Sequence, residues 1–535
     1  MKFSPNAHHD KSVSRLKRCF SLLVCSWLIV VPTSRLAAQN QQNQTIKAPT
    51  DYIFGSRHCT GCHDQPAKQT PNSRMNEWLT WHHQDRHRIA FDWFDEASRL
   101  SPVGQRAQIM AQNLGISDLK QAKQCTGCHS VPVKANVPTS YFDKPEERAR
   151  EGVTCVSCHG TSREWVVNHV AYGDPVWKNA SDRERWEKFG LVNLKNPLVQ
   201  AGTCISCHVG DADPKANRRI THEMYVAGHP PLPGIEVAMF TRQEPRHWLV
   251  RDESDQMTRK TANAIDLLAV SGLVTLKSEL ELLRQEIREH PESGISDFAQ
   301  FDCQACHHSV SRTSQPAWRQ IRTGQSVPPG RPRLPQWPRQ LVRLSLIMQN
   351  PQQWQANEKR LNDQINSLET SLAGSPSGLQ SREIVSELDD LIVLINGWLE
   401  RCEKQWTQKN QLGPDSLTNT LTIYLGSLID DQKLNQMDYH AARQIGWALK
   451  TLTDHDSKIK TEKQQKLMID LDQTLGLELR DDGIEESLPV QPGQNPQPVA
   501  EFLAERLKRI SRWNPQTFHS IVNEMNELYG SPADR

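Results

Sequence analysis

Residues 155–159 read Cys155-Val156-Ser157-Cys158-His159, and this pattern of two cysteines three positions apart, followed directly by histidine, occurs five times. The other copies are Cys59-Thr60-Gly61-Cys62-His63, Cys125-Thr126-Gly127-Cys128-His129, Cys204-Ile205-Ser206-Cys207-His208 and Cys303-Gln304-Ala305-Cys306-His307. At the cysteine and histidine content of this chain, a chance match is expected about 0.01 times. The five copies, numbered one to five along the chain, therefore share a chemical role.

The spacing within each motif has a physical reason. Two thiols three positions apart lie on one side of a helical turn, where both vinyl groups of one haem can be captured as thioethers. The next residue then directs its imidazole to the iron as the proximal ligand. The sequence therefore predicts five covalently attached haem c groups, held by the ten motif cysteines. The predicted proximal ligands are His63, His129, His159, His208 and His307.

Other uses of paired cysteines explain the pattern less well. A disulfide framework gives no reason for a histidine after every pair. Zinc ribbons use two pairs for each metal ion, and five pairs is an odd number. Thioredoxin-like redox motifs need a βαβ pattern, which the sequence lacks.

The first 38 residues have the pattern of a secretory signal peptide. A basic stretch at 11–18 precedes the apolar run 19–31 and a small-residue site at Ala37-Ala38. This run is too short to span a bilayer comfortably, and no later run approaches the roughly 18 apolar residues that a span needs. We therefore expect an exported, periplasmic mature chain without a transmembrane segment. The formal net charge of +1 gives no basic field for binding nucleic acid.

Histidines outside the motifs decide whether each iron has a second axial ligand. A second histidine closes an iron for electron transfer, whereas an iron with one histidine can bind a small ligand. By their sequence context, the expected distal ligands are His87, His169, His222, His229 and His247. His308 adjoins a proximal ligand and is a weaker candidate, because adjacent side chains rarely face one iron. Surface or supporting roles are expected for His58, His82, His83 and His290.

These motifs resemble the multihaem cytochromes c of the cytochrome c-554 type, in an extended five-haem form. The resemblance rests on Asp85-Arg86-His87-Arg88-Ile89-Ala90, on the third motif within 152–160, on Trp165 followed by His169, and on 221–248. It covers residues 51–320. It implies that His87 closes the iron of His159, that His169 closes the iron of His63, and that the iron of His129 is five-coordinate. The fifth motif and the extra His229 and His247 depart from the family pattern and leave the last point open.

Outside the haem region, apolar residues recur at helical spacing. Leu361, Ile365, Leu368 and Leu372 form one such stripe. We expect a mainly α fold, with a multihaem cytochrome c domain of sparse regular structure followed by a helical C-terminal domain. The expected division is signal peptide 1–38, polar linker 39–50, pentahaem domain 51–320, Pro/Arg-rich connector 321–340, α-helical domain 341–480, linker 481–500 and C-terminal helix 501–535.

The sequence favours an electron carrier that passes electrons through its haems between redox partners, such as other cytochromes or a membrane quinol oxidase. The alternative is an enzyme that acts on a small nitrogen or sulfur compound at one five-coordinate haem. Cytochrome c nitrite reductases typically use a lysine-ligated C-x-x-C-K haem, and the chain has no such motif. The residues leave open whether the protein has a substrate of its own.

Overall fold

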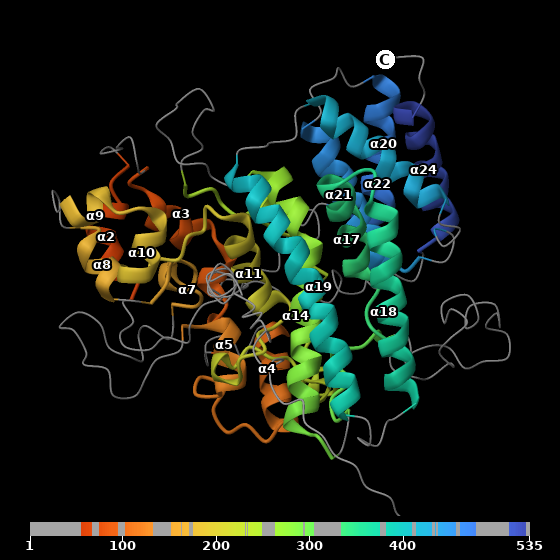
Figure 1. Cartoon of the computed structure of the whole chain (residues 1–535). Coiled ribbons are helices and arrows are strands. Elements are labelled where there is room, and N and C mark those ends of the chain that lie inside the picture. The colour runs from red at the N-terminus through yellow and green to blue at the C-terminus, as the bar shows by residue number, and fades with distance from the viewer. Residues whose placement is uncertain are drawn as a thin grey trace, which may run out of the picture. The chain divides into compact units, whose positions relative to one another are not determined.

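The structure is a computed structural model. It describes residues 55–66, 74–94, 102–131, 151–161, 163–170, 175–230, 232, 234–248, 263–292, 295–303, 333–374, 381–408, 414–430, 434, 437–455, 461–477 and 513–530. Within these ranges all regular secondary structure is helical (Figure 1), which confirms the expected mainly α fold. No helix in the described part of the chain is long and apolar enough to cross a membrane. The expected signal peptide and the linkers 39–50 and 481–500 lie outside the described residues.

Four of the motifs form the last turn of a helix that ends at the motif histidine. These helices are α2 (Arg57–His63), α5 (Lys123–His129), α7 (Cys155–His159) and α11 (Pro197–His208). The helical turn places the two thiols of each pair on one side, as the spacing predicts. Of the fifth motif, only Cys303 lies within the described residues.

Short helices connect the motif helices. They are α3 (Glu77–Gln84), α4 (Pro102–Asn113), α8 (Arg163–Asn168), α9 (Pro175–Asn179), α10 (Asp182–Phe189), α12 (His222–Ala227) and α13 (Val237–Gln243), with 3₁₀ turns η2 (Arg86–Ile89), η3 (Asp92–Phe94) and η5 (Pro214–Ala216). Two small apolar clusters lie among them. One contains Phe91, Phe94, Ala107, Ala111 and Leu119, and the other contains Val131, Val156 and Trp165. Side-chain packing alone therefore gives the region around the first three motifs little core.

The long helix α14 (Ala264–Glu289) joins the motif region to the C-terminal helices. It contacts α11 on one side and the C-terminal helices α17 and α19 on the other (Figure 1). The C-terminal helices are α17 (Trp337–Gln349), α18 (Trp354–Gly374), α19 (Ser381–Thr407), α20 (Pro414–Asp430), α21 (Tyr439–His455), α22 (Glu462–Leu475) and α24 (Pro515–Gly530). One hydrophobic cluster extends from Ala201 on α11 to Met525 on α24. The last motif helix and the C-terminal helices therefore share a core.

A glycine allows the close approach of α14 and α17. A Cβ added to Gly272 would lie 2.6 Å from the Cβ of Leu341 and 2.6 Å from the backbone nitrogen of Val342. We expect Gly272→Ala to lower the free energy of unfolding by about 2 kcal/mol, because overpacking against backbone exceeds the gain in helix propensity of about 1 kcal/mol. Chemical denaturation of the haem-loaded protein measures the change.

Gly397 in the middle of α19 provides the matched control. An added Cβ there would meet no atom within 4 Å. Gly397→Ala should therefore stabilise the protein by up to about 1 kcal/mol, through helix propensity alone. Equal effects of the two substitutions would contradict the close packing of α14 on α17.

Candidate functional site

Each described motif histidine faces a second histidine from another part of the chain. The ring centres are 6.4 Å apart for His63 and His169, 6.5 Å for His129 and His229, 6.5 Å for His159 and His247, and 6.3 Å for His208 and His87. An imidazole nitrogen binds a transition metal at about 2 Å, so two imidazoles on opposite sides of one ion have ring centres about 6 Å apart. The four pairs therefore fit an iron held between two histidines.

Hydrogen bonds occupy the Nδ1 atoms of six of these eight rings and leave their Nε2 for a metal. Nδ1 of His63 lies 2.9 Å from Glu77, and Nδ1 of His87 lies 3.0 Å from Asp85. The other Nδ1 contacts are to backbone carbonyls: His129 to Ala90 at 3.1 Å, His169 to Val166 at 2.8 Å, His229 to Pro230 at 2.7 Å and His247 to Pro245 at 3.3 Å. Metal-bound histidines are usually oriented by such a contact.

Burial favours the neutral form of most of these rings. It lowers the pKa of His129, His159 and His208 to about 4 in each case, and it also lowers the pKa of His169, His229 and His247. Neutral imidazole is the form that binds metal. These six rings are therefore ready ligands at neutral pH.

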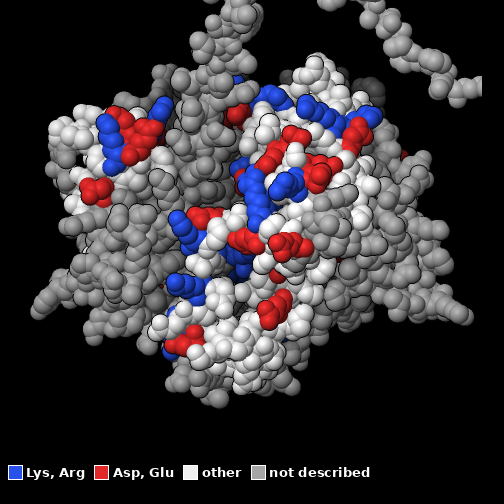
Figure 2. All heavy atoms as spheres, turned by 60° about the horizontal axis from the view of Figure 1, so that its bottom comes forward, with Lys and Arg blue, Asp and Glu red and all other residues white. Residues whose placement is uncertain are grey.

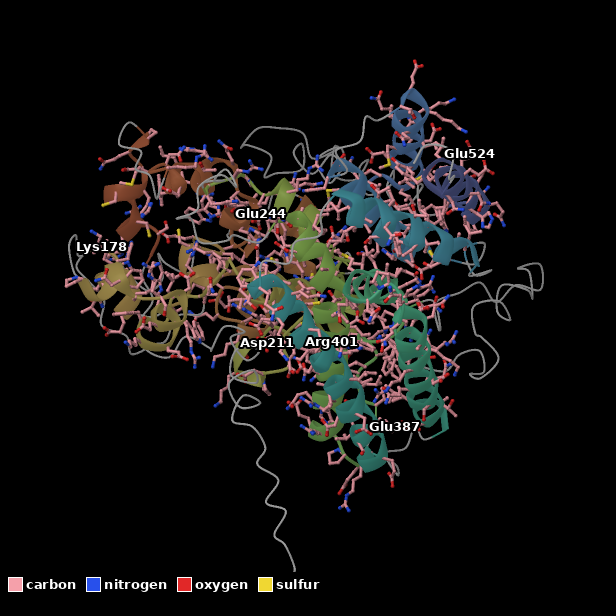
Figure 3. The ribbon with its side chains drawn as sticks, turned by 45° about the horizontal axis from the view of Figure 1, so that its top comes forward. Lys178, Asp211, Glu244, Glu387, Arg401 and Glu524 are labelled. Atoms are coloured by element: carbon pink, nitrogen blue, oxygen red, sulfur yellow. The ribbon has the colours of Figure 1, made fainter. Side chains whose placement is uncertain are left out.

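Two rings with carboxylate partners behave differently. The hydrogen bond that His63 donates to the Glu77 carboxylate raises the pKa of His63. Burial alone would lower the pKa of His87, but Asp85, with a smaller contribution from Glu244 (labelled in Figure 3), raises it to about 9. The carboxylates therefore make these two rings more basic, and hence stronger donors, than the rings bound to carbonyls.

Aromatic side chains surround the histidine pairs. The buried Trp165 lies 6.3 Å from the ring of His159 and 5.3 Å from that of His169, and its Nε1 donates to the carbonyl of Gly160 at 2.7 Å. Phe240 on α13 lies between His208 and Trp447 of α21, at 5.6 and 5.8 Å. The C-terminal helices therefore help to cover the fourth motif.

Contacts between sulfur atoms show which motifs are neighbours. The side chains of Cys59 and Cys155 lie close enough to interact, and so do those of Cys128 and Cys207. These contacts bring motif one beside motif three and motif two beside motif four. Cys158 of motif three also interacts electrostatically with Cys204 of motif four. The four motifs are therefore adjacent in the order one, three, four, two.

The pairs differ in part from those that the resemblance implied. His169 faces His63 as expected, but His87 faces His208 and not His159. His159 instead faces His247. The resemblance pointed to an open iron at His129, a point that the extra histidines left undecided, and the structure brings His229 opposite it.

The segment after the fourth motif explains these differences. Its helix α12 packs on α4, where Asn113 Nδ2 donates to the carbonyl of Ala227 at 3.1 Å and so brings His229 towards the second motif. Further along this segment, Arg74 donates a hydrogen bond to the carbonyl of Arg246, next to His247. The segment therefore contributes two of the four histidines that face a motif histidine.

His222 lies near the start of the fifth motif. Its ring is 6.2 Å from that of Phe298, and its backbone nitrogen donates to Asp297 at 3.1 Å. Cys303 is exposed. The remaining residues of this site, Cys306, His307 and His308, lie outside the described residues, so the expected pairing of His222 stays a prediction.

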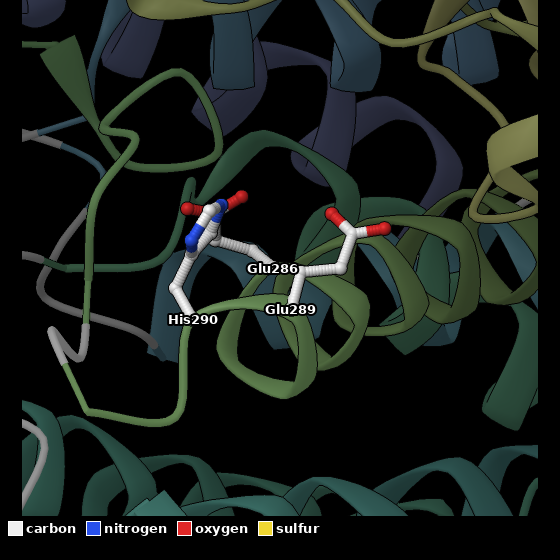
Figure 4. Close-up of side chains that lie close together, drawn as sticks. All are labelled: Glu286, Glu289 and His290. Atoms are coloured by element: carbon white, nitrogen blue, oxygen red, sulfur yellow. The ribbon is translucent and has the colours of Figure 1, made fainter.

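The other histidines of the region have structural surroundings. His82 stacks on Trp78 with ring centres 4.4 Å apart, and His58 and His83 are exposed. His290 groups with Glu286 and Glu289 at the end of α14 (Figure 4). Arg219 forms ion pairs with both of these glutamates, so half of their charge is already compensated.

Several supporting residues were not predicted. Glu77, Asp85 and Glu244 contact the histidines, and Arg218 contacts two motifs. Asp85 precedes His87 by two residues, so a carboxylate close to an expected ligand is a signal that sequence analysis could have used. Arg218 and Glu244 have no comparable local signal.

Comparison with known proteins supports the haem assignment. Residues 58–160 match the family model described as cytochrome c554 and c-prime, and this segment contains the first three motifs and His87. Neither a curated protein nor a solved structure matches the chain. Members of this family are c-type cytochromes, which bind haem covalently and act in electron transfer. Residues 58–160, about a fifth of the chain, are therefore similar to the cytochrome c554-type family.

Proposed function

We propose that this protein is an exported electron carrier with five haem c groups, in which two histidines ligate each iron of the first four motifs. The observation that carries the proposal is the set of four facing histidine pairs, with ring centres 6.3 to 6.5 Å apart. Bis-histidine haem iron supplies one-electron chemistry with little rearrangement. The fifth site, at Cys303, Cys306 and His307, rests on its sequence motif, with His222 as the proposed distal ligand.

The residues of the chain have three roles in this function. The cysteine pairs fix the macrocycles, the Nδ1 contacts orient the axial rings, and buried aromatic side chains such as Trp165 exclude water. The adjacency of the motifs supports a path in the order one, three, four, two. Each transfer moves one electron from a donor redox protein to an acceptor redox protein, and no bond forms or breaks.

Partners are expected to be other redox proteins, including cytochromes or a membrane quinol oxidase. Cys303 is exposed, which supports electron exchange at the fifth motif. On the face drawn in Figure 2, basic and acidic side chains are interspersed. Recognition on this face would therefore use local charge pairs rather than one broad field.

The alternative, a haem enzyme with one five-coordinate iron, is less well supported at the described sites. The family pattern suggested an open iron at His129, and His229 faces that residue. An enzyme would have to use the fifth site. The observations therefore favour the carrier.

Haem counting and spectroscopy of the purified protein test the proposal. We expect the intact mass to exceed that of the polypeptide from residue 39 onward by five haem groups, and the protein to lie in the periplasmic fraction. The spectra should be entirely low-spin, and the reduced protein should bind no carbon monoxide. A high-spin fraction that binds carbon monoxide or cyanide would support the enzyme.

Removing the carboxylate from His63 should raise one reduction potential. Glu77 contacts Nδ1 of His63, and a hydrogen-bonded carboxylate favours the oxidised iron because it adds negative charge to the ligand. We expect Glu77→Gln to raise the potential of the first haem by roughly 60 mV, a tenfold change in a one-electron equilibrium. Spectroelectrochemical titration measures it. Glu187→Gln, at a half-exposed pair with Arg183, should leave all potentials unchanged, and a lowered potential in Glu77→Gln would contradict the role of the carboxylate.

A further inference from the structure

One buried guanidinium joins the second and fourth motifs. Arg218 follows η5 and is 6% exposed. Its Nε donates to the carbonyl of Gly127 at 2.9 Å, and its Nη1 donates to Oγ of Ser206 at 2.9 Å. Gly127 lies between the two cysteines of motif two, and Ser206 lies between those of motif four.

The backbone holds this side chain in place. A Cβ added to Gly127 would lie 2.0 Å from the carbonyl oxygen of Asn217, so the segment before Arg218 lies directly against the turn of motif two. The carbonyl of Arg218 accepts from the backbone nitrogen of Asp211 at 2.9 Å. Ser278 on α14 donates to the carbonyl of the adjacent Gly210 at 3.1 Å. The position of the guanidinium is therefore set by α14 and by both motifs.

The charge of Arg218 is permanent, because a guanidinium does not lose its proton in proteins. The groups that it faces are Asp211, labelled in Figure 3, and the sulfur atoms of Cys128, Cys207 and Cys158. Sulfur atoms bound to haem as thioethers carry no charge. Asp211 is then the acidic group in this set that opposes the cation.

We propose that Arg218 raises the reduction potentials of the haems bound at motifs two and four, and so sets the direction of electron flow. The proposal rests on the proposed function. A buried positive charge beside the attachment sulfurs stabilises the form of the haem that holds the additional electron. The interaction is strong because the site is largely withdrawn from water.

The charged groups beside the axial histidines show which haem has the higher reduction potential. At motif one, Glu77 contacts His63, and Glu151 accepts from the backbone nitrogen of Ser56, near Cys59. At motif two, the contacts of His129 and His229 are to uncharged carbonyls. Asp85 opposes the effect of Arg218 at motif four through His87. Motif two therefore has a higher potential than motifs one and four, and electrons move towards it from motif one.

Spectroelectrochemical titration of Arg218→Gln in the haem-loaded full chain tests the proposal. We expect two of the midpoint potentials to fall, the larger by a tenfold change in the one-electron equilibrium, which is about 59 mV. Arg218→Lys keeps a positive charge and should restore most of each shift. Arg219→Gln is the matched control, because the Arg219 side chain pairs with Glu286 and Glu289, and it should leave the potentials unchanged.

Asp211→Asn gives a second measurement that does not remove the bridge between the motifs. It takes away the opposing charge and should raise the same two potentials, so it decides the question if Arg218→Gln fails to fold. Unchanged potentials in a fully loaded Arg218→Gln, or in Asp211→Asn, would overturn the proposal. Equal shifts in Arg218→Lys and Arg218→Gln would overturn it as well, because they would mean that the hydrogen bonds act and the charge does not. Haem content and spin state, read separately on each protein, report on the proposed function itself.

Discussion

Replacement of His229 by alanine is expected to turn one haem of five from low-spin to high-spin. His229 faces His129 at a ring-centre distance of 6.5 Å, and its Nδ1 lies 2.7 Å from the carbonyl of Pro230. Alanine leaves His129 as the sole protein ligand at that iron, and an iron with one histidine can bind small molecules. The reduced variant should bind one carbon monoxide per molecule, measured by absorbance titration, where the unaltered protein binds none.

The control for this variant is a histidine without a facing motif residue. His83 is exposed at the end of α3, and His83→Ala should leave the spectra unchanged. If His229→Ala remained entirely low-spin with all its haems present, the proposed pair of His129 and His229 would be wrong. Carbon monoxide binding to the unaltered protein would instead point to an open iron elsewhere, most directly at the fifth motif.

The second large effect is expected when no haem can be attached. With all ten motif cysteines changed to serine, we expect the region from α2 to α8 to unfold and the helices from α14 onward to stay folded. In the described part of this region, only eight buried side chains gather in two apolar clusters. Their burial offsets only a small part of the conformational entropy that the region loses on folding. Covalent haems must therefore supply most of the core of this region.

Hydrogen exchange measured by mass spectrometry distinguishes the two regions. Amide protection should be lost across α2 to α8 and kept in α14, α17 and α19, which belong to the large apolar cluster. Cys402→Ser changes a buried cysteine outside the motifs and should keep every haem. Protection of α2 to α8 in the ten-serine chain would contradict this account, because it would mean that the polypeptide folds there without haem.

Much of the local structure follows from the sequence. Leu361, Ile365, Leu368 and Leu372 were expected on one helical face, and all four are buried on α18. The four described motifs end helices as their spacing requires. These features depend on residues a few positions apart, where the geometry of a helical turn fixes which side chains lie together.

The pairing of the histidines depends on residues far apart in the chain, unlike these local features. His87, His169, His229 and His247 each face a motif histidine, and His87 faces His208 where the resemblance implied His159. The expected division into a haem domain and a helical domain also does not predict that the two share a core. Helix α14 packs in one apolar cluster with α11 and the C-terminal helices.

The sequence by itself determined the chemistry of this protein, because attachment sulfurs and proximal ligand lie within five consecutive residues and need only a helical turn to act together. Tertiary structure alone decided which histidine faces which motif and where Arg218 places its charge. Those contacts join segments far apart in the chain, through the packing of α12 on α4 and of the 216–218 segment on motif two. Such contacts form only when the whole chain folds, so no local pattern of residues records them.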